Sequence, residues 1–239
     1  KIMKHSFCSG SKQTPLVLHI PHNGTLLPDD FIYERSKEEL QEDIHRIVDH
    51  HTDILFAPLL ENGGLQVLNP FCRMYFDPER FEDPKQEIMN EIGMGVFYTH
   101  TTQNKRFRKD DTPEIYQRRI KSLYRPYHEQ LTQACQNQIE TFGYCFLIDG
   151  HSYPRECYPF ERFPDDNRPE IDLGTNPEHT PTWVRDIAFK VFSNAGYSVA
   201  FNQPFKGTLV PLPLLGDKRL FAMMLEVRRD VYLEHPAGI

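Results

Sequence analysis

Short apolar runs, each bounded by turn residues, recur along the chain and predict buried strands. They cover residues 16–20 (LVLHI), 65–68 (LQVL), 144–148 (YCFLI), 198–201 (SVAF) and 221–227 (FAMMLEV). Continuous apolar runs of this length are typical of strands that are covered on both faces of a sheet.

Longer segments with helical periodicity separate these runs. The first begins at Ser36, where Glu39 follows three residues later in a capping-box arrangement, and it extends to about residue 60. A second helix is expected over about 112–142, with Pro126 kinking or dividing it, and a third over about 182–194. Strands that alternate with helices predict an α/β fold with helices on both faces of the sheet.

Two stretches, 76–113 and 152–181, are rich in proline and charge and fit neither pattern. Loops of that length in a compact domain are usually functional or disordered. We see no linker between them and the rest of the 239 residues, so we expect a single domain over 1–239 with these stretches as active-site loops.

Composition narrows the functional classes. Thirty-four acidic against 27 basic residues give a formal charge of -7, which disfavours a broad nucleic-acid surface because phosphate binding needs a cationic field. The chain contains no apolar run of about 20 residues that could span a membrane, and its first ten residues lack the apolar stretch of a signal peptide. Five cysteines without a CxxC pair argue against a disulfide framework, so we expect a cytoplasmic protein.

Candidate chemistry gathers where the predicted strands end. His22 follows the run 16–20, His151 follows 144–148, and Glu226 lies in the last run. Ligands of open α/β sheets bind at the carboxyl ends of strands, and two imidazoles with carboxylates can form a hydrolytic zinc site. The alternative role for each histidine is an ordinary hydrogen bond. For Glu226, which lies among apolar residues, the alternative is a structural ion pair with an arginine.

A third metal ligand stays ambiguous from spacing alone. Asp49, His50, His51 and Asp53 all fall on the first predicted helix. His51 lies on the apolar stripe of that helix, so we expect it to be packed in the core.

Basic residues cluster unusually for an acidic protein. Arg73 and Arg80 flank Asp77, and Lys206 follows the run 198–201. Each can be ordinary surface charge, but an anionic substrate would require some of them, because arginine binds carboxylates in bidentate geometry.

Seven short motifs in one order resemble the N-formylglutamate amidohydrolase family, also called N-formylglutamate deformylases. The motifs are IPHNG (20–24), RMYFDPER (73–80), RPYHEQL (125–131), DGHS (149–152), DLGT (172–175), PFKG (204–207) and LEV (225–227). Each is weak alone, but together they extend the resemblance from about Leu16 to Glu234.

The resemblance implies a three-layer α/β/α sandwich, with a mostly parallel or mixed central sheet, related to the zinc-dependent exopeptidases. It implies a divalent metal, with zinc as the expected ion, and hydrolysis of N-formyl-L-glutamate to formate and L-glutamate, a reaction of histidine degradation. Carried over by position, His22, Asp49 and His151 would be the metal ligands. Glu226 would activate the water and later protonate the leaving amine.

The same resemblance assigns the substrate pocket of a small anionic N-acyl amino acid. Arg73 and Arg80 would bind its carboxylate, Asp77 would orient them, and His128 and Lys206 would line the pocket.

The chain departs from the family pattern at Glu79, where asparagine is usual, and at Thr208, where glycine is common. An extra acid beside the pocket can repel a dicarboxylate. A deacylase or carboxypeptidase-like hydrolase of different preference therefore stays open, as does a binding homologue without catalysis. Retention of Glu226 favours an enzyme.

Overall fold

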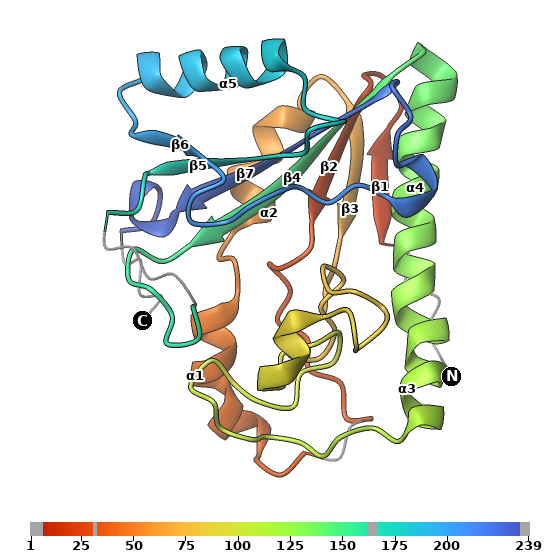
Figure 1. Ribbon diagram of the computed structural model, residues 1–239, viewed down its shortest axis with the longest axis vertical. Helices are drawn as coiled ribbons and strands as arrows, with labels where there is room; N and C mark the ends of the chain where they lie inside the picture. The colour runs from red at the N-terminus through yellow and green to blue at the C-terminus, as the bar shows by residue number, and fades with distance from the viewer. Residues whose placement is uncertain (1–6, 31–32, 162–166, 235–239) are drawn as a thin grey trace.

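The computed structural model describes residues 7–30, 33–161 and 167–234, and its strands form a mixed seven-stranded sheet (Figure 1). The strand order is β1-β3-β2-β4-β7-β5-β6. The strands are β1 (Cys8–Ser11), β2 (Leu16–Ile20), β3 (Gly64–Leu68), β4 (Cys145–Tyr153), β5 (Ile171–Thr175), β6 (Val199–Phe201) and β7 (Leu220–Arg228). The α-helices are α1 (Lys37–Ile47), α2 (Thr52–Leu55), α3 (Pro113–Arg119), α4 (Arg125–Phe142) and α5 (Thr182–Asn194).

All five apolar runs form strands, and two further strands were not predicted. Strand β1 is a short polar edge strand, and β5 lies inside the stretch 152–181, of which residues 162–166 are outside the described part. Strands β4 and β7 pair in parallel from Cys145↔Leu220 to Tyr153↔Arg228. Both strands therefore continue past their apolar runs, and His151 lies within a strand rather than after it.

The first predicted helix breaks into pieces. Helix α1 ends at Ile47, and α2 and the 3₁₀ helix η1 (Ala57–Leu60) follow after a turn. His51 has left-handed backbone geometry (φ 54°) in this turn and is exposed. The expectation of a packed His51 was wrong, because the apolar stripe ends with α1.

The second predicted helix is divided, as the position of Pro126 indicates. Helix α3 continues through a π-helical turn, η3 (Ile120–Tyr124), into α4, whose first turn contains the proline. A proline ring cannot supply an N–H to the preceding turn, which accounts for a wider turn there. Helix α5 has the predicted bounds, and no helix in the described ranges is long and apolar enough to cross a bilayer.

Helices cover both faces of the sheet, which confirms the α/β fold. Val17 of β2 packs in the same apolar cluster as residues of α4, whereas its neighbour Leu18 packs in a second cluster with residues of α5. Successive side chains of a strand point to opposite faces, so α4 and α5 lie on opposite sides, as Figure 1 shows. Helix α1 and the loop between β3 and α3 lie beyond one end of the sheet (Figure 1).

The capping box at the start of α1 is present and testable. The Ser36 hydroxyl accepts the Glu39 N–H at 3.2 Å, and the Glu39 carboxylate accepts the Ser36 N–H at 2.7 Å. We predict that Ser36→Ala lowers the free energy of unfolding by about 1 kcal/mol in denaturant titration, while Ser36→Thr, which keeps the oxygen, changes it less. Equal unfolding midpoints for Ser36→Ala and the parent would contradict this account of the helix start.

Candidate metal and substrate site

Neighbouring strands place a row of ionisable side chains across the sheet. The strand registers pair His151 of β4 with Glu226 of β7, and Glu226 with Asp172 of β5. On the other side of β4, Asp149 pairs with His19 of β2. These side chains are all buried. Pairing of the strands, rather than proximity in the sequence, therefore builds this part of the site.

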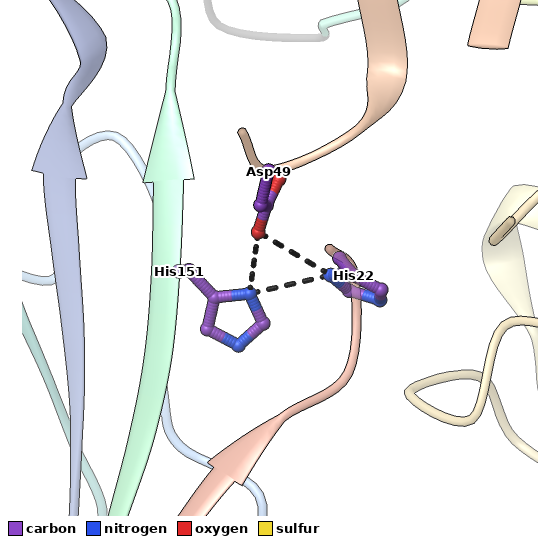
Figure 2. A group of neighbouring side chains, drawn as sticks. All are labelled: His22, Asp49 and His151. Carbon is purple, nitrogen blue, oxygen red and sulfur yellow. Dashed lines mark hydrogen bonds and ion pairs between the residues drawn. The ribbon is translucent and has the colours of Figure 1, made fainter. Parts of the chain in front are cut away.

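His22 and Asp49 complete a compact group with His151 (Figure 2). His22 follows β2, Asp49 follows α1, and the Asp49 N–H donates to the His22 carbonyl at 2.9 Å. The two Nδ1 atoms of His22 and His151 lie 3.2 Å apart. An Asp49 carboxylate oxygen lies 3.1 Å from Nδ1 of His151 and 3.8 Å from Nδ1 of His22. Their side chains converge on one point and could hold a metal ion.

The other nitrogen of each imidazole contacts a buried carboxylate. His22 Nε2 lies 2.9 Å from Asp77, and His151 Nε2 lies 3.0 Å from Asp149. Burial alone would raise the pKa of both aspartates, but their cationic and imidazole neighbours hold it well below the usual range. An ionised carboxylate only accepts hydrogen bonds, so each Nε2 donates, and Nδ1 is the nitrogen of each ring that faces the group.

Two nitrogen lone pairs at this distance repel one another unless a proton or a cation lies between them. Two atoms about 2.1 Å from a tetrahedral zinc are about 3.4 Å apart, close to the 3.2 Å between the two Nδ1 atoms. Burial would lower the pKa of His151, yet Glu79 and Asp149 hold it well above its usual value. The surrounding negative charge thus favours a positive charge at this point, which a metal ion can supply in place of a proton.

Asp77 is the centre of the predicted arginine cluster. Arg73 donates to one of its oxygens from Nε and Nη2, at 3.1 and 2.9 Å, and Tyr98 donates to the same oxygen at 2.7 Å. Arg80 lies 3.4 Å away and donates mainly to the carbonyl of Met94 and to the Tyr98 hydroxyl. The structure brings these predicted residues together, with Asp77 between the arginines and a metal-site histidine.

Glu226 is buried without an ion-pair partner. Its Oε2 atom accepts no hydrogen bond from the described residues, and no arginine among them forms an ion pair with it. Burial raises its pKa well above the usual range, and the nearby carboxylates of Asp49 and Asp172 raise it further. A carboxyl group that is buried, unpaired and next to a candidate metal site is suited to accept and return protons.

A cavity of about 1260 Å³ opens onto this group. It is lined by all of the predicted site residues apart from Asp77: His22, Asp49, Arg73, Arg80, His128, His151, Lys206 and Glu226. His128 is fixed in the wall because its Nε2 donates to the Pro78 carbonyl at 2.9 Å. Asp172 accepts the N–H groups of Gln203 and Phe205 at 2.9 and 2.8 Å, which holds the loop that carries Lys206.

The remaining candidates for a third ligand lie elsewhere. His50 contacts the His45 carbonyl through Nε2, His51 is exposed, and Asp53 belongs to no possible metal group in the described part of the chain. Asp49 is therefore the acidic residue of this segment that the fold brings to both histidines.

Sequence reasoning left two contributors without a role. Asp149 contacts His151, and His19 contacts Asp149, but neither His19 nor Asp149 contributes an atom to the group of His22, Asp49 and His151. A usable signal was the spacing of Asp149 and His151, because residues two apart in a strand face the same side. A polar His19 within an apolar run was the other signal.

Comparison with known proteins places this chain in a family. The model of the N-formylglutamate amidohydrolase family matches residues 14–233. An N-formylglutamate deformylase of Pseudomonas putida is 26% identical over 229 residues, which cover 92% of this chain and 82% of the relative.

Solved structures agree with this match. An N-formylglutamate amidohydrolase from Ralstonia eutropha JMP134 superposes with a TM-score of 0.78 at 26% identity, covering 97% of this chain and 88% of that one. A gene product of Agrobacterium tumefaciens, at 16% identity and a TM-score of 0.64, shares the fold over 98% and 90% of the two chains. Because the family match extends over most of the sequence, the chain belongs to the N-formylglutamate amidohydrolase family.

Proposed function

We propose that this protein hydrolyses N-formyl-L-glutamate, or a closely related N-acyl amino acid, at a divalent metal site. The observation that carries the proposal is the convergence of His22, Asp49 and His151 at the cavity wall beside the unpaired Glu226, in a chain of this family. Two nitrogen ligands and one carboxylate are typical of catalytic zinc sites, so zinc is the ion we propose.

Three ligands leave one position of a tetrahedral ion for water or substrate. A bound zinc would polarise the formyl oxygen and lower the pKa of a water to about 7. His22 and His151 would bind through Nδ1, since Asp77 and Asp149 occupy their Nε2 atoms. These carboxylates also orient the two rings.

Glu226 carries the proton transfers in this proposal. It accepts a proton from the attacking water, whose oxygen bonds to the formyl carbon. The carbon–nitrogen bond then breaks, and Glu226 returns the proton to the leaving amine, giving formate and the amino acid. The raised pKa of Glu226, caused by its burial, suits a group that must hold a proton between these two steps.

Free cationic groups would bind the substrate carboxylates. Arg73 uses Nε and Nη2 on Asp77, and no described residue accepts a hydrogen bond from its Nη1. Lys206 lines the cavity without a salt bridge to any residue in the described ranges. We therefore assign substrate contact to Lys206 and Arg73, and a supporting position in the wall to Arg80, whose guanidinium is engaged by Met94 and Tyr98.

One observation favours a second substrate class. The Glu79 carboxylate lines the cavity and lies 3.3 Å from Nε2 of His151. This negative charge opposes a substrate with two carboxylates more than one with a single carboxylate. An N-acyl amino acid with a neutral side chain is therefore the alternative substrate. An inactive binding homologue is disfavoured because Glu226 is retained in a position to act.

Metal binding distinguishes Asp49 from the other candidate ligands of the same segment. We predict that chelator-treated protein binds about one equivalent of zinc, and that Asp49→Asn loses this binding because the cluster loses a charged ligand. The matched controls His51→Ala and Asp53→Asn should bind zinc like the parent. Isothermal titration measures both stoichiometry and affinity, and parental zinc affinity in Asp49→Asn would rule out this residue as a ligand.

Replacement of the proposed base should affect turnover but not metal content. Glu226→Gln keeps the size of the side chain and removes its capacity to accept a proton, so we expect kcat to fall about 10²- to 10⁴-fold with zinc still bound. Glu140→Gln, at an exposed position of α4 that does not line the cavity, makes the same charge change and should keep the parental kcat. Parental turnover by Glu226→Gln would assign the base to another group.

Loss of the free ammonium should weaken substrate binding. We predict that Lys206→Met raises the KM for N-formyl-L-glutamate about 10- to 100-fold with a smaller change in kcat, since a hydrogen bond between charged groups contributes about 1.5–3 kcal/mol. Lys218→Met is the control, because Lys218 is exposed and does not line the cavity. An unchanged KM in Lys206→Met would place the substrate carboxylates elsewhere.

A further inference from the structure

A chain of buried hydrogen bonds lies behind the metal-site histidine His151. His151 Nε2 is 3.0 Å from an Asp149 oxygen, and the same oxygen is 2.8 Å from Nδ1 of His19. Nε2 of His19 is 2.7 Å from the Tyr127 hydroxyl. These four side chains are 0–3% exposed and come from β2, β4 and α4, so the core holds them in place.

We propose that Asp149 is a positioning residue for the metal site: supported by His19 and Tyr127, it keeps the ring proton of His151 on Nε2 and so leaves Nδ1 free to bind the metal. This inference rests on the metal site of the proposed function. It adds a determinant of metal affinity that contributes no ligand atom.

The direction of these hydrogen bonds follows from the groups that make them, beginning at the Tyr127 hydroxyl. Burial raises the pKa of Tyr127 well above its ordinary value, so its hydroxyl keeps its proton and can donate to Nε2 of His19. With Nε2 of His19 accepting from Tyr127, the ring N–H of His19 is on Nδ1, which donates to Asp149. The other oxygen of Asp149 accepts the Leu209 N–H, and the oxygen that faces both histidines also accepts the Nε2–H of His151.

Asp149 connects the metal site to the substrate loop as well. Its second oxygen accepts the N–H of Leu209 at 3.1 Å, three residues after Lys206. Metal-binding histidines usually donate their other ring N–H to a carboxylate or carbonyl, and loss of such a partner typically weakens metal binding 10- to 100-fold. Asp149 is such a partner of His151, and its hydrogen bond to Leu209 also fixes the loop that carries Lys206, the proposed substrate-binding lysine.

A second metal ion between His19, Glu79 and Asp149 is the competing interpretation, because these side chains also offer a compact set of ligand atoms. The 2.8 Å between Nδ1 of His19 and the Asp149 oxygen is shorter than the about 3.4 Å that separates two ligand atoms of one tetrahedral zinc. The Glu79 carboxylate is more distant, at 3.9 Å from that nitrogen. The contacts therefore favour a positioning chain.

The test measures metal affinity in variants along the chain. The whole protein is stripped of metal, and Zn²⁺ affinity is measured by competition with a chromophoric chelator. Asp149→Asn should weaken binding about 10- to 100-fold, because an amide can present its NH₂ group to His151 and favour the ring form with the proton on Nδ1. Asp43→Asn, a buried acid on α1 that pairs with Arg35, is the matched control and should bind like the parent.

Variants of His19 should weaken Zn²⁺ binding to different degrees, and one that keeps an N–H should partly restore it. His19→Leu removes the donor to Asp149 and should weaken Zn²⁺ binding less than Asp149→Asn does. His19→Asn retains an N–H near the Nδ1 position and should bind more tightly than His19→Leu. Tyr127→Phe removes a single hydroxyl and should have the smallest effect.

The absorption spectrum of bound Co²⁺ should change in Asp149→Asn, since this spectrum reports ligand geometry. Circular dichroism checks that each variant is folded.

The outcomes separate this inference from the proposed function. If the parent protein binds no Zn²⁺, both are overturned. If the parent binds Zn²⁺ while Asp149→Asn binds it equally well with an unchanged Co²⁺ spectrum, the positioning role alone is overturned. Should Asp149→Asn fail to fold, equal affinities of His19→Leu and His19→Asn overturn it instead. Uptake of two equivalents, with the second lost in His19→Leu, would support the competing second ion.

Discussion

Burial of carboxyl groups at one end of the central strands is the constraint on which the site depends. Asp49, Asp77, Asp149 and Glu226 are all at least nine-tenths buried there, in surroundings where an unpaired carboxylate is costly. Arginines satisfy Asp77, imidazoles satisfy Asp149, and Oε2 of Glu226 has no partner in the described part of the chain. The compensation is therefore incomplete beside the two histidines, where a metal ion would complete it.

The fold supplies this arrangement through long-range pairing. Parallel pairing of β2 with β4 and of β4 with β7 aligns His19, Asp149, His151 and Glu226 across the sheet. The turn after α1 then brings Asp49 over the row, and the loop after β3 supplies Asp77. Of the proposed ligands, His151 lies in a strand, and His22 and Asp49 closely follow a strand and a helix, whereas the proposed substrate contacts lie on loops. Binding residues of proteins commonly lie on loops that a rigid scaffold positions.

The sequence predicts most of the strands and most of the candidate site residues. The other features of the fold and site could not be predicted, for physical reasons. Apolar runs predicted five strands because buried strands leave a strong pattern, whereas β5 (IDLGT) interrupts its apolar residues with Asp172 and Gly174. Strand ends indicated His22, His151 and Glu226. The choice of Asp49 needed the family resemblance, because helical periodicity does not reveal that α1 ends at Ile47.

The support behind the ligands could not be predicted, since it depends on register between strands that are about 130 residues apart in the sequence. The contact of Asp77 with Arg73 was expected from the family resemblance, whereas its contact with His22 was missed, because the loop after β3 brings together residues 55 apart in the sequence. Zinc as the metal, a cytoplasmic location and a single domain over residues 1–239 stay predictions.

Formate release is the measurement that tests the central claim most directly. Protein stripped of metal is assayed with N-formyl-L-glutamate before and after addition of one equivalent of zinc. Our account predicts no formate release above the buffer rate from the metal-free protein and turnover on addition of zinc. Equal formate release by the metal-free and the zinc-loaded protein would contradict it.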